Sequence, residues 1–90
     1  MVTGIILVNV ERAKIADVIE GIIKIDGVSE VYTVAGEYDI AVIVRVRTNA
    51  ELSDIIACKM THDIDGIVHT KTLISLSSLA KVDLEKVFLS

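Results

Sequence analysis

Several residue types are scarce in this sequence, and each shortage excludes a class of structure or function. A single cysteine, Cys58, cannot form a disulfide within the chain, and this composition favours a reducing compartment, the cytoplasm. Charged residues interrupt every apolar run before it reaches the roughly 18 residues that a membrane span requires, so no membrane partner is expected. The opening stretch MVTGIILVNVER lacks the basic flank and the small-residue cleavage site of a secretory signal.

Positive charge and aromatic rings are scarce as well. The chain carries 13 Asp and Glu residues against 9 Lys and Arg residues, for a formal net charge of -4, and its aromatic content is 3%. Proteins that bind nucleic acid by themselves usually present a basic face, and binders of single strands add aromatic side chains on which bases stack. We therefore expect no direct DNA binding.

The apolar content, in contrast, is high. Hydrophobic residues make up 52% of the 90 residues and the mean hydropathy is +0.63, which excludes a disordered chain because apolar burial can offset the entropy of ordering. The length corresponds to a single domain, 1–90, with a core over residues 2–79 and a tail over 80–90 that the pattern does not place. A domain of this size gains stability from burial against a partner.

Two periodicities alternate along the chain. Alternating or β-branched runs predict strands at 2–10, 28–35, 39–47 and 67–79, with a tight connection at 36–38. Helical spacing of apolar residues predicts helices at 12–24 and at 48–64, the second opened by the capping-box pattern Thr48-x-x-Glu51. The two apolar stripes consist of Ile15, Val18, Ile19, Ile22 and Ile23, and of Leu52, Ile55, Ile56, Met60 and Ile64.

The tripeptide IDG occurs twice, at 25–27 and at 64–66, and each copy closes a helical stretch and opens a strand. Glycine just past the end of a helix commonly takes the left-handed conformation that stops it. The elements therefore read β-α-β followed by β-α-β. This order predicts an α+β fold, the ferredoxin-like βαββαβ arrangement, with a four-stranded antiparallel sheet and two helices on one face.

The predicted sheet is apolar on both faces. Within 39–47, Val42 and Val44 point to one side while Ala41 and Ile43 point to the other. An open apolar face of this extent exceeds the few hundred Å² that monomers usually expose. We expect a second subunit to cover it in a homo-oligomer, with dimers joining in a ring of four or five to give an octamer or decamer. Alternatively, the tail 80–90 folds back over the sheet.

The stretch IDGVSEVYTVAGEYDIAVIVRV, followed by GIVHTKTLISL, resembles the ligand-binding and oligomerisation domain of the Lrp/AsnC transcriptional regulators, known as the RAM domain. The resemblance covers residues 2–79, and its most specific elements are the turn 36–39, Gly-Glu-Tyr-Asp, and the pair Thr70-x-Thr72. The family usually has Asp where Glu37 stands, a departure that could alter the preferred ligand. No helix-turn-helix precedes the domain, so the chain resembles the stand-alone members of the family.

The resemblance implies a pocket for an amino acid or a related small effector, formed between dimers where these turns meet. Its candidate residues are Gly36, Glu37, Tyr38, Asp39, Thr70 and Thr72. A glycine turn exposes backbone N–H groups to a carboxylate, a carboxylate at Asp39 or Glu37 suits an ammonium, and hydroxyls at alternate positions of a strand face the same side. From the residues alone, the turn equally suits an ordinary hairpin, and threonine is a common strand residue.

The resemblance also implies indirect modulation of transcription, by co-assembly with full-length Lrp/AsnC regulators. Three alternatives stay open. An ACT-like domain favours a glycine at the first strand–helix junction, where this chain has NVERAK. A dimeric α+β barrel enzyme of the small monooxygenase type needs a polar group such as His69 inside the barrel. A purely structural subunit needs no ligand.

No other constellation indicates catalysis, a metal or a cofactor. His62 and His69 are seven residues apart without a Cys or Glu at ligand spacing. Cys58 lies within the apolar stripe of the second helix and is interpreted as a small hydrophobe. The phosphate loop of an acylphosphatase needs an arginine after the first strand, and Arg12 lacks the accompanying glycines. We therefore predict that the chain is not an enzyme and needs no cofactor or metal.

Overall fold

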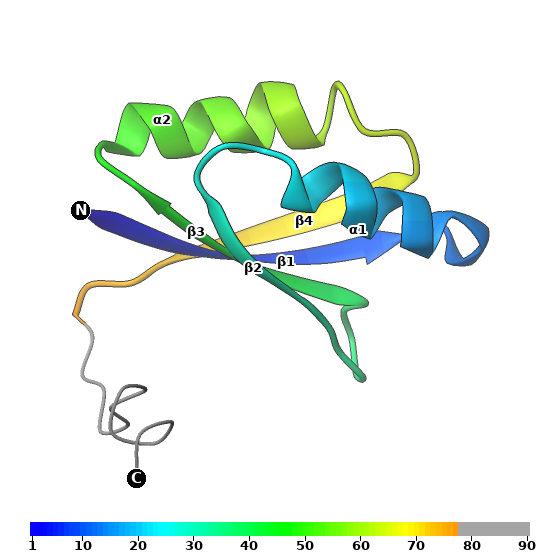
Figure 1. The fold of residues 1–90 in the computed structure, drawn as a ribbon. Helices are drawn as coiled ribbons and strands as arrows, with labels where there is room; N and C mark the ends of the chain where they lie inside the picture. Colours follow the sequence, from blue (N-terminus) through cyan, green and yellow to red (C-terminus); the bar gives the residue numbers. More distant parts are fainter. Residues whose placement is uncertain (78–90) are drawn as a thin grey trace, which may run out of the picture.

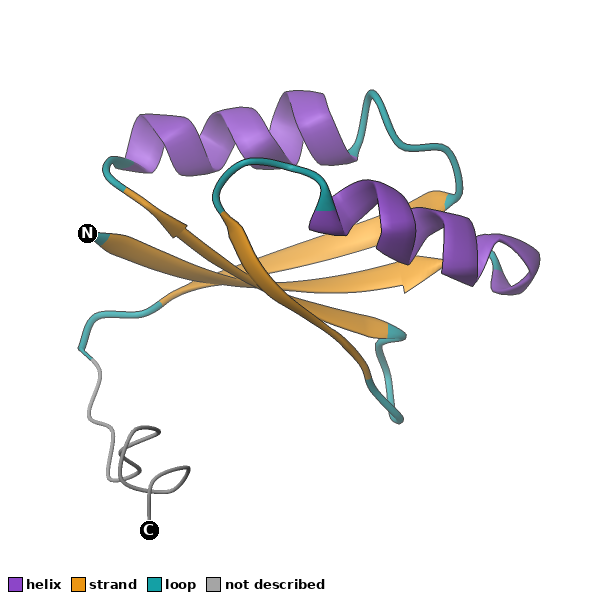
Figure 2. Cartoon of the chain, viewed as in Figure 1, coloured by secondary structure: helices purple, strands orange, loops and turns teal. Residues whose placement is uncertain are grey.

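The computed structural model describes residues 1–77, which form a four-stranded antiparallel sheet with both helices packed on one of its faces (Figures 1 and 2). The strand order is β2-β3-β1-β4, the order of a ferredoxin-like fold, so the predicted fold class is confirmed. The strands are β1 (Val2–Val10), β2 (Val28–Thr33), β3 (Ile40–Val46) and β4 (Ile67–Ile74). The helical elements are η1 (Arg12–Lys14), α1 (Ile15–Ile23), α2 (Asn49–Asp54) and η2 (Ile55–Met60).

Strand register assigns each residue to a face of the sheet. Ile6 lies opposite Val42 on β3 and opposite Thr72 on β4, and Val8 lies opposite Ile40 and Thr70. Residues directly opposite in an antiparallel sheet point to the same side. The face that the helices cover therefore carries the alternate, fully buried positions of the two central strands.

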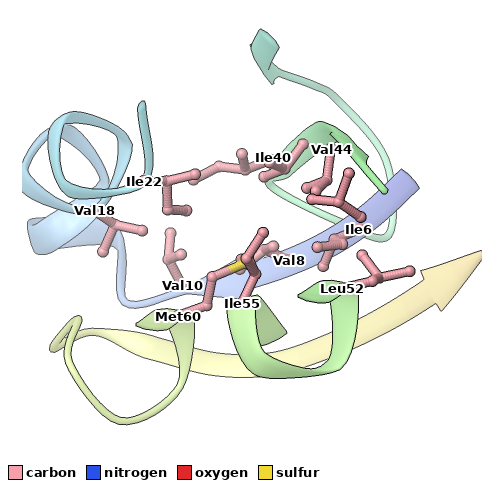
Figure 3. Close-up of a cluster of buried hydrophobic side chains, with 12 residues drawn as sticks. Ile6, Val8, Val10, Val18, Ile22, Ile40, Val44, Leu52, Ile55 and Met60 are labelled. Carbon is pink, nitrogen blue, oxygen red and sulfur yellow. The ribbon is translucent and has the colours of Figure 1, made fainter. Parts of the chain in front are cut away.

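The hydrophobic core lies between that face and the helices (Figure 3). It contains Ile6, Val8, Val10, Val18, Ile22, Ile40, Val42, Val44, Val46, Leu52, Ile55 and Met60. Fully burying each Val, Ile, Leu or Met side chain contributes about 1.5–3 kcal/mol. Both predicted helical stripes contribute to this core, and their partly buried members packed against it are Ile15, Ile19, Ile56 and Ile64, the last of which follows the end of the second helix. Ile23, in contrast, is 48% exposed. One residue beyond the buried Ile22 on α1, Ile23 is rotated about 100° away from the sheet.

The start of the second helix follows the predicted capping box. The Thr48 hydroxyl oxygen accepts a hydrogen bond from the Glu51 backbone N–H at 3.2 Å. The Glu51 carboxylate accepts one from the Arg47 N–H at 3.1 Å, one residue before the cap. The Thr48 side chain therefore satisfies one N–H group that the helix leaves without an intrahelical partner, and the Glu51 side chain satisfies the N–H just before the cap.

Replacing Thr48 by Ala should lower the free energy of unfolding by about 1 kcal/mol, because the Glu51 N–H then loses its acceptor. Urea denaturation followed by circular dichroism measures this difference. Thr48→Ser is the matched control, since it keeps the accepting hydroxyl and should stay close to the original stability. Equal losses for both variants would show that the methyl group, rather than the cap, matters at this position.

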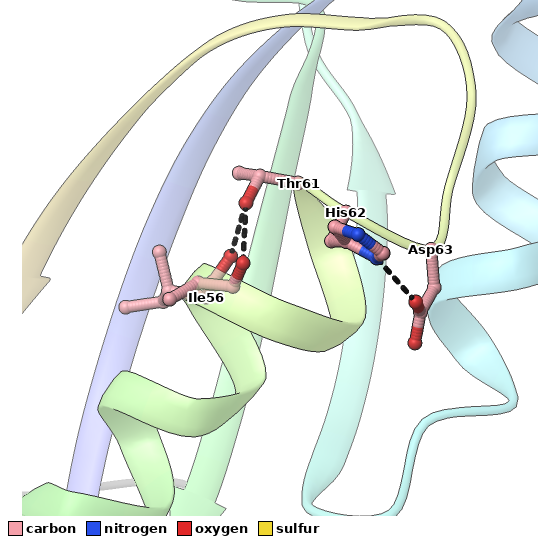
Figure 4. A network of polar contacts seen from close by, with 5 residues as sticks. Ile56, Thr61, His62 and Asp63 are labelled. Atoms are coloured by element: carbon pink, nitrogen blue, oxygen red, sulfur yellow. Dashed lines mark hydrogen bonds and ion pairs between the residues drawn. The ribbon is translucent and has the colours of Figure 1, made fainter.

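The second helix changes pitch in its middle. Residues Ile55–Met60 form a turn of π-helix, and the Thr61 N–H reaches back five residues to the Ile56 carbonyl at 3.2 Å. Ile55 and Met60 are both buried. Lys59, which lies four residues after Ile55 and would share its face in a regular α-helix, remains half-exposed. The wider turn therefore rotates Met60 into the core. Figure 4 shows the end of this helix, where the Thr61 hydroxyl donates to the carbonyls of Ile56 and Ala57 at 3.1 and 2.8 Å.

Both IDG turns adopt the predicted glycine conformation. Gly27 has a φ of 99° and Gly66 a φ of 106°, values that side chains with a Cβ rarely adopt. The Gly27 carbonyl accepts a hydrogen bond from the Arg45 N–H, and the Gly66 carbonyl accepts one from the Glu11 N–H, each at 2.8 Å. Each turn is thus fastened to the end of the neighbouring central strand, and the positive φ accounts for the glycine in both copies.

The strand ends differ from the prediction. β2 ends at Thr33 rather than residue 35, and β4 ends at Ile74 rather than residue 79. Beyond Ile74, the Ser75 N–H still donates a hydrogen bond to the Thr3 carbonyl of β1 at 2.9 Å. Residues 78 and 79 and the predicted tail 80–90 lie outside the described residues. Within residues 1–77, the helices are too short or too polar to cross a membrane.

Candidate functional site

The loop of the β2–β3 hairpin, residues 34–39, carries four of the six predicted site residues. It lies beyond the end of the sheet, away from the helices in the view of Figure 1. Gly36 has a φ of 130°, and a Cβ built on it would meet no atom within 4 Å, so backbone conformation rather than packing favours glycine there. Gly36 and Glu37 are exposed, whereas Tyr38 and Asp39 are half-buried. The loop is closed by the hydrogen bond from the Val34 N–H to the Asp39 carbonyl at 2.9 Å.

Asp39 fastens this loop to the end of β1. One oxygen of its carboxylate, Oδ2, accepts a hydrogen bond from the Val10 N–H at 3.0 Å, and its own N–H donates to the Val8 carbonyl at 3.0 Å. Where the backbone pairing of β1 with β3 ends, the Asp39 side chain thus accepts an N–H of β1, as a backbone carbonyl of β3 does within the paired region. Sequence reasoning missed this structural role, because it depends on a contact between residues 29 positions apart. In residues 1–77, the second oxygen, Oδ1, has no hydrogen-bond donor and can accept one from a ligand.

The two predicted threonines occupy another part of the molecule. Thr70 and Thr72 are half-buried, and they share the helix-covered face of the sheet with Val8 and Ile6. Their hydroxyl groups therefore lie on the same side of β4. Asp39 contacts β1 from the β3 side, whereas Thr70 pairs with β1 from the opposite side. Within residues 1–77 no hydrogen bond joins the hairpin to either threonine, and β1 lies between them.

The uncovered face of the sheet is apolar in its middle and polar at its edges. Ile5 and Leu7 on β1 lie opposite Ile43 and Ala41 on β3, and all four are only half-buried. Leu73 extends this apolar strip onto β4, where it is 44% exposed. The edges of the same face carry Glu30 and Tyr32 on β2, and His69 and Lys71 on β4.

Several side-chain groups have shifted pKa values. A hydrogen bond from Lys14, reinforced by its charge, lowers the pKa of the Asp65 carboxyl, and Asp65 and Glu11 together raise the pKa of the Lys14 ammonium. A 2.6 Å hydrogen bond to Glu30 raises the pKa of Tyr32. A hydrogen bond to Asp54, with some desolvation, raises the pKa of the exposed Cys58 thiol. Thiolate is the reactive form of cysteine, so this environment disfavours a nucleophilic Cys58.

The two histidines are placed apart from each other. His62 follows the second helix, with its Nδ1 3.0 Å from an oxygen of Asp63, and both side chains are exposed (Figure 4). His69 lies on the uncovered face of the sheet, opposite Asn9. In the part of the chain that the structure describes, no three His, Cys, Asp or Glu residues are grouped closely enough to hold a metal ion.

Comparison with known proteins gives matches over most of the chain. The sequence model of the family described as "Lrp/AsnC ligand binding domain" matches residues 3–83. The HTH-type transcriptional regulator FL11 of Pyrococcus furiosus is 31% identical over 75 residues, which are 83% of this chain and 48% of FL11. A second FL11, from Pyrococcus abyssi, is matched over 47% of its length, so the chain spans about half the length of the curated relatives it matches.

Two solved structures have a similar fold. TTHA0845 of Thermus thermophilus is 27% identical with a TM-score of 0.83, and the alignment covers 90% of this chain and 100% of that chain. The transcriptional regulator NMB0573 of Neisseria meningitidis, solved as a complex with L-Met, has a TM-score of 0.77 over 96% of this chain and 58% of its own. Its identity is 14%, so this second likeness is one of fold.

Proposed function

This chain belongs to the Lrp/AsnC ligand-binding domain family, and on that premise we propose that it senses an amino acid or a related small effector through the hairpin loop 34–39. The observation that carries the proposal is the family match over residues 3–83, which encloses all six candidate residues. The exposed Gly36 turn offers backbone N–H groups to a carboxylate. Asp39 offers Oδ1 to an ammonium while Oδ2 holds Val10.

The type of ligand is supported by the Neisseria regulator, which was solved as a complex with L-Met and includes a domain of the same fold. At 14% identity that likeness does not assign a ligand to this chain, so the amino acid is part of our proposal. Glu37, where the resembling family usually has Asp, adds one methylene to the side chain at the mouth of the loop.

Assembly is the second part of the proposal. The strip formed by Ile5, Leu7, Ala41, Ile43 and Leu73 is covered by the same face of a second subunit, which gives a two-fold dimer. Dimers then join into a ring of four or five, as an octamer or decamer. Because β1 separates the hairpin from Thr70 and Thr72 within one chain, residues from more than one subunit complete the effector pocket.

The third part concerns regulation. FL11 is named an HTH-type transcriptional regulator and this chain matches about half of it, over 75 residues. We place the chain in a non-enzymatic role, in which it changes the activity of full-length Lrp/AsnC regulators by assembling with them. It contributes no direct DNA contact of its own, consistent with a net charge of -4.

Thermal unfolding in the presence of each of the twenty amino acids, followed by calorimetry on those that shift the midpoint, tests the sensing function. A ligand that binds only the folded state raises stability by about 2.7 kcal/mol at a hundred times its Kd. For a domain of this size we expect the midpoint to rise by several degrees with at least one amino acid. If no amino acid produces a shift or a heat of binding, the sensing proposal is wrong and the structural-subunit alternative remains.

A further inference from the structure

A charged cleft lies at the end of the sheet opposite the hairpin. It is bounded by the turn Asp26-Gly27, by the end of β3 and by the second helix, and its volume is about 390 Å³. Val46 and Ile55 form its apolar part, and both belong to the buried core. Sites for small molecules typically occupy about 300–1,000 Å³ and combine an apolar wall with a few polar groups.

The cleft is lined by equal numbers of positive and negative side chains. Arg45, Arg47 and Lys59 are the cations, and Asp26, Glu51 and Asp54 are the carboxylates. Lys59 and Asp54 approach within 4.0 Å of each other, and one oxygen of Glu51 accepts the Arg47 N–H of the helix cap. Over residues 1–77, the side chains of Asp26, Arg45 and Arg47 take part in no ion pair. The cleft therefore presents both signs of charge to a ligand.

The two IDG turns and the helices packed against them can be compared position by position, because the fold repeats the β-α-β unit. A Cβ on Gly66 would meet Val18 at 3.1 Å, and a Cβ on Gly27 would meet Ile55 at 2.9 Å, so Val18 and Ile55 occupy equivalent places beside the two IDG turns. One helical turn before each of them, four residues earlier, stand Lys14 and Glu51.

The two equivalent positions carry opposite charges. At the second IDG turn, the Lys14 ammonium bridges Asp65 and Glu11, and this ion pair spans the cleft between the turn and the first helix. At the first turn, Glu51 stands at the position of Lys14 and lines the cleft together with Asp26. The Lys59 ammonium of this cleft pairs with Asp54, and within residues 1–77 the Asp26 and Glu51 carboxylates take part in no ion pair. Like charges that share a site favour a bound cation.

We propose that this cleft binds a second α-amino acid, with its ammonium between Asp26 and Glu51, its carboxylate on Arg45 or Arg47, and its side chain against Val46 and Ile55. The ammonium occupies the place that Lys14 fills in the other half of the molecule. A zwitterion matches both signs of charge in the cleft without adding net charge. This site is remote from the hairpin loop and does not rest on the sensing function proposed for it.

Calorimetry and hydrogen–deuterium exchange on the full chain with L-methionine test the site. We expect protection in peptides that contain Asp26-Gly27 and Arg45 to Glu51, apart from any protection in the hairpin 34–39. Asp26→Asn, an isosteric change at an exposed residue, should weaken binding at the cleft at least tenfold. The matched control is Asp65→Asn in the other half, which should leave this affinity unchanged, with circular dichroism confirming that both variants fold.

A second pair of variants uses the repeat directly. Glu51→Lys places an ammonium at the position equivalent to Lys14 and should abolish protection at the cleft, whereas Glu51→Gln keeps an oxygen for the helix cap and should weaken binding only in part. Propylamine and propionate, which carry one charge each, should bind at least tenfold more weakly than L-methionine. Protection confined to the hairpin would overturn this site and leave the sensing proposal intact. Equal binding of propylamine and L-methionine would overturn the zwitterion assignment.

Discussion

Replacing Ile43 by Asp should prevent the proposed dimer from forming and leave a folded monomer. Ile43 lies on the uncovered face of the sheet, opposite Ile5, and is only half-buried in the single chain. A carboxylate there remains in water while the chain is alone, so the fold tolerates it. In a dimer that covers this face, the charge is removed from water without a partner, at a cost of several kcal/mol for each subunit.

The same change one residue earlier should have a different outcome. Val42 points to the helices, has an exposed fraction of 0% and lies opposite Ile6 and Val31. Asp at this position puts an unpaired charge into the core, which costs several kcal/mol. Small domains are stable by only about 5–15 kcal/mol in total. Val42→Asp should therefore unfold most or all of the chain rather than release a folded monomer.

Analytical ultracentrifugation gives the mass of each variant and circular dichroism its helical and strand content. The expected pattern is an assembled, folded original chain, a folded 9.8 kDa monomer for Ile43→Asp and an unfolded chain for Val42→Asp. Ala16→Asp adds the same charge on the exposed side of α1, away from the sheet, and should keep the dimer. A monomeric original chain, or an Ile43→Asp variant as unfolded as Val42→Asp, would contradict the proposed interface.

The contrast between neighbouring residues shows what the sequence alone could predict. A period of two along 39–47 assigns Val42 and Ile43 to opposite faces without any structure. The IDG repeats and the Thr48-x-x-Glu51 box mark the turns and the helix start for equally local reasons, and the order of elements followed from them. Local patterns are thus sufficient for the topology and for the two faces of the sheet.

Features that depend on distant contacts could not be predicted in this way. The end of β4 at Ile74 depends on its pairing with β1, and the π-turn at Ile55–Met60 accompanies the burial of both of its end residues against the sheet. The five-residue step between these two apolar residues was the available signal for the π-turn. The candidate site shares this limit, because Asp39 is held by Val10 on another strand and because β1 separates it from Thr70.

The double role of Asp39 decides how the hairpin site must be tested. Asp39→Ala removes both the acceptor for the Val10 N–H and the charge proposed to hold an ammonium. A hydrogen bond to a charged group contributes about 1.5–3 kcal/mol, so effector binding should weaken roughly ten- to a hundredfold. The same substitution should also lower the free energy of unfolding, by about 1–3 kcal/mol, because the partly buried Val10 N–H loses its acceptor.

Asp39→Asn separates these two effects. Its amide oxygen can still accept the Val10 N–H, so the stability in urea should stay close to that of the original chain, while its neutral side chain no longer attracts an ammonium. We expect calorimetry to show effector binding weakened about tenfold or more in this variant. Glu37→Gln, which removes a charge from the exposed part of the same loop, tests whether the effect belongs to Asp39 alone. If the effector binds Asp39→Asn as tightly as the original chain, the carboxylate is only the structural link between β3 and β1, and the ammonium is held elsewhere.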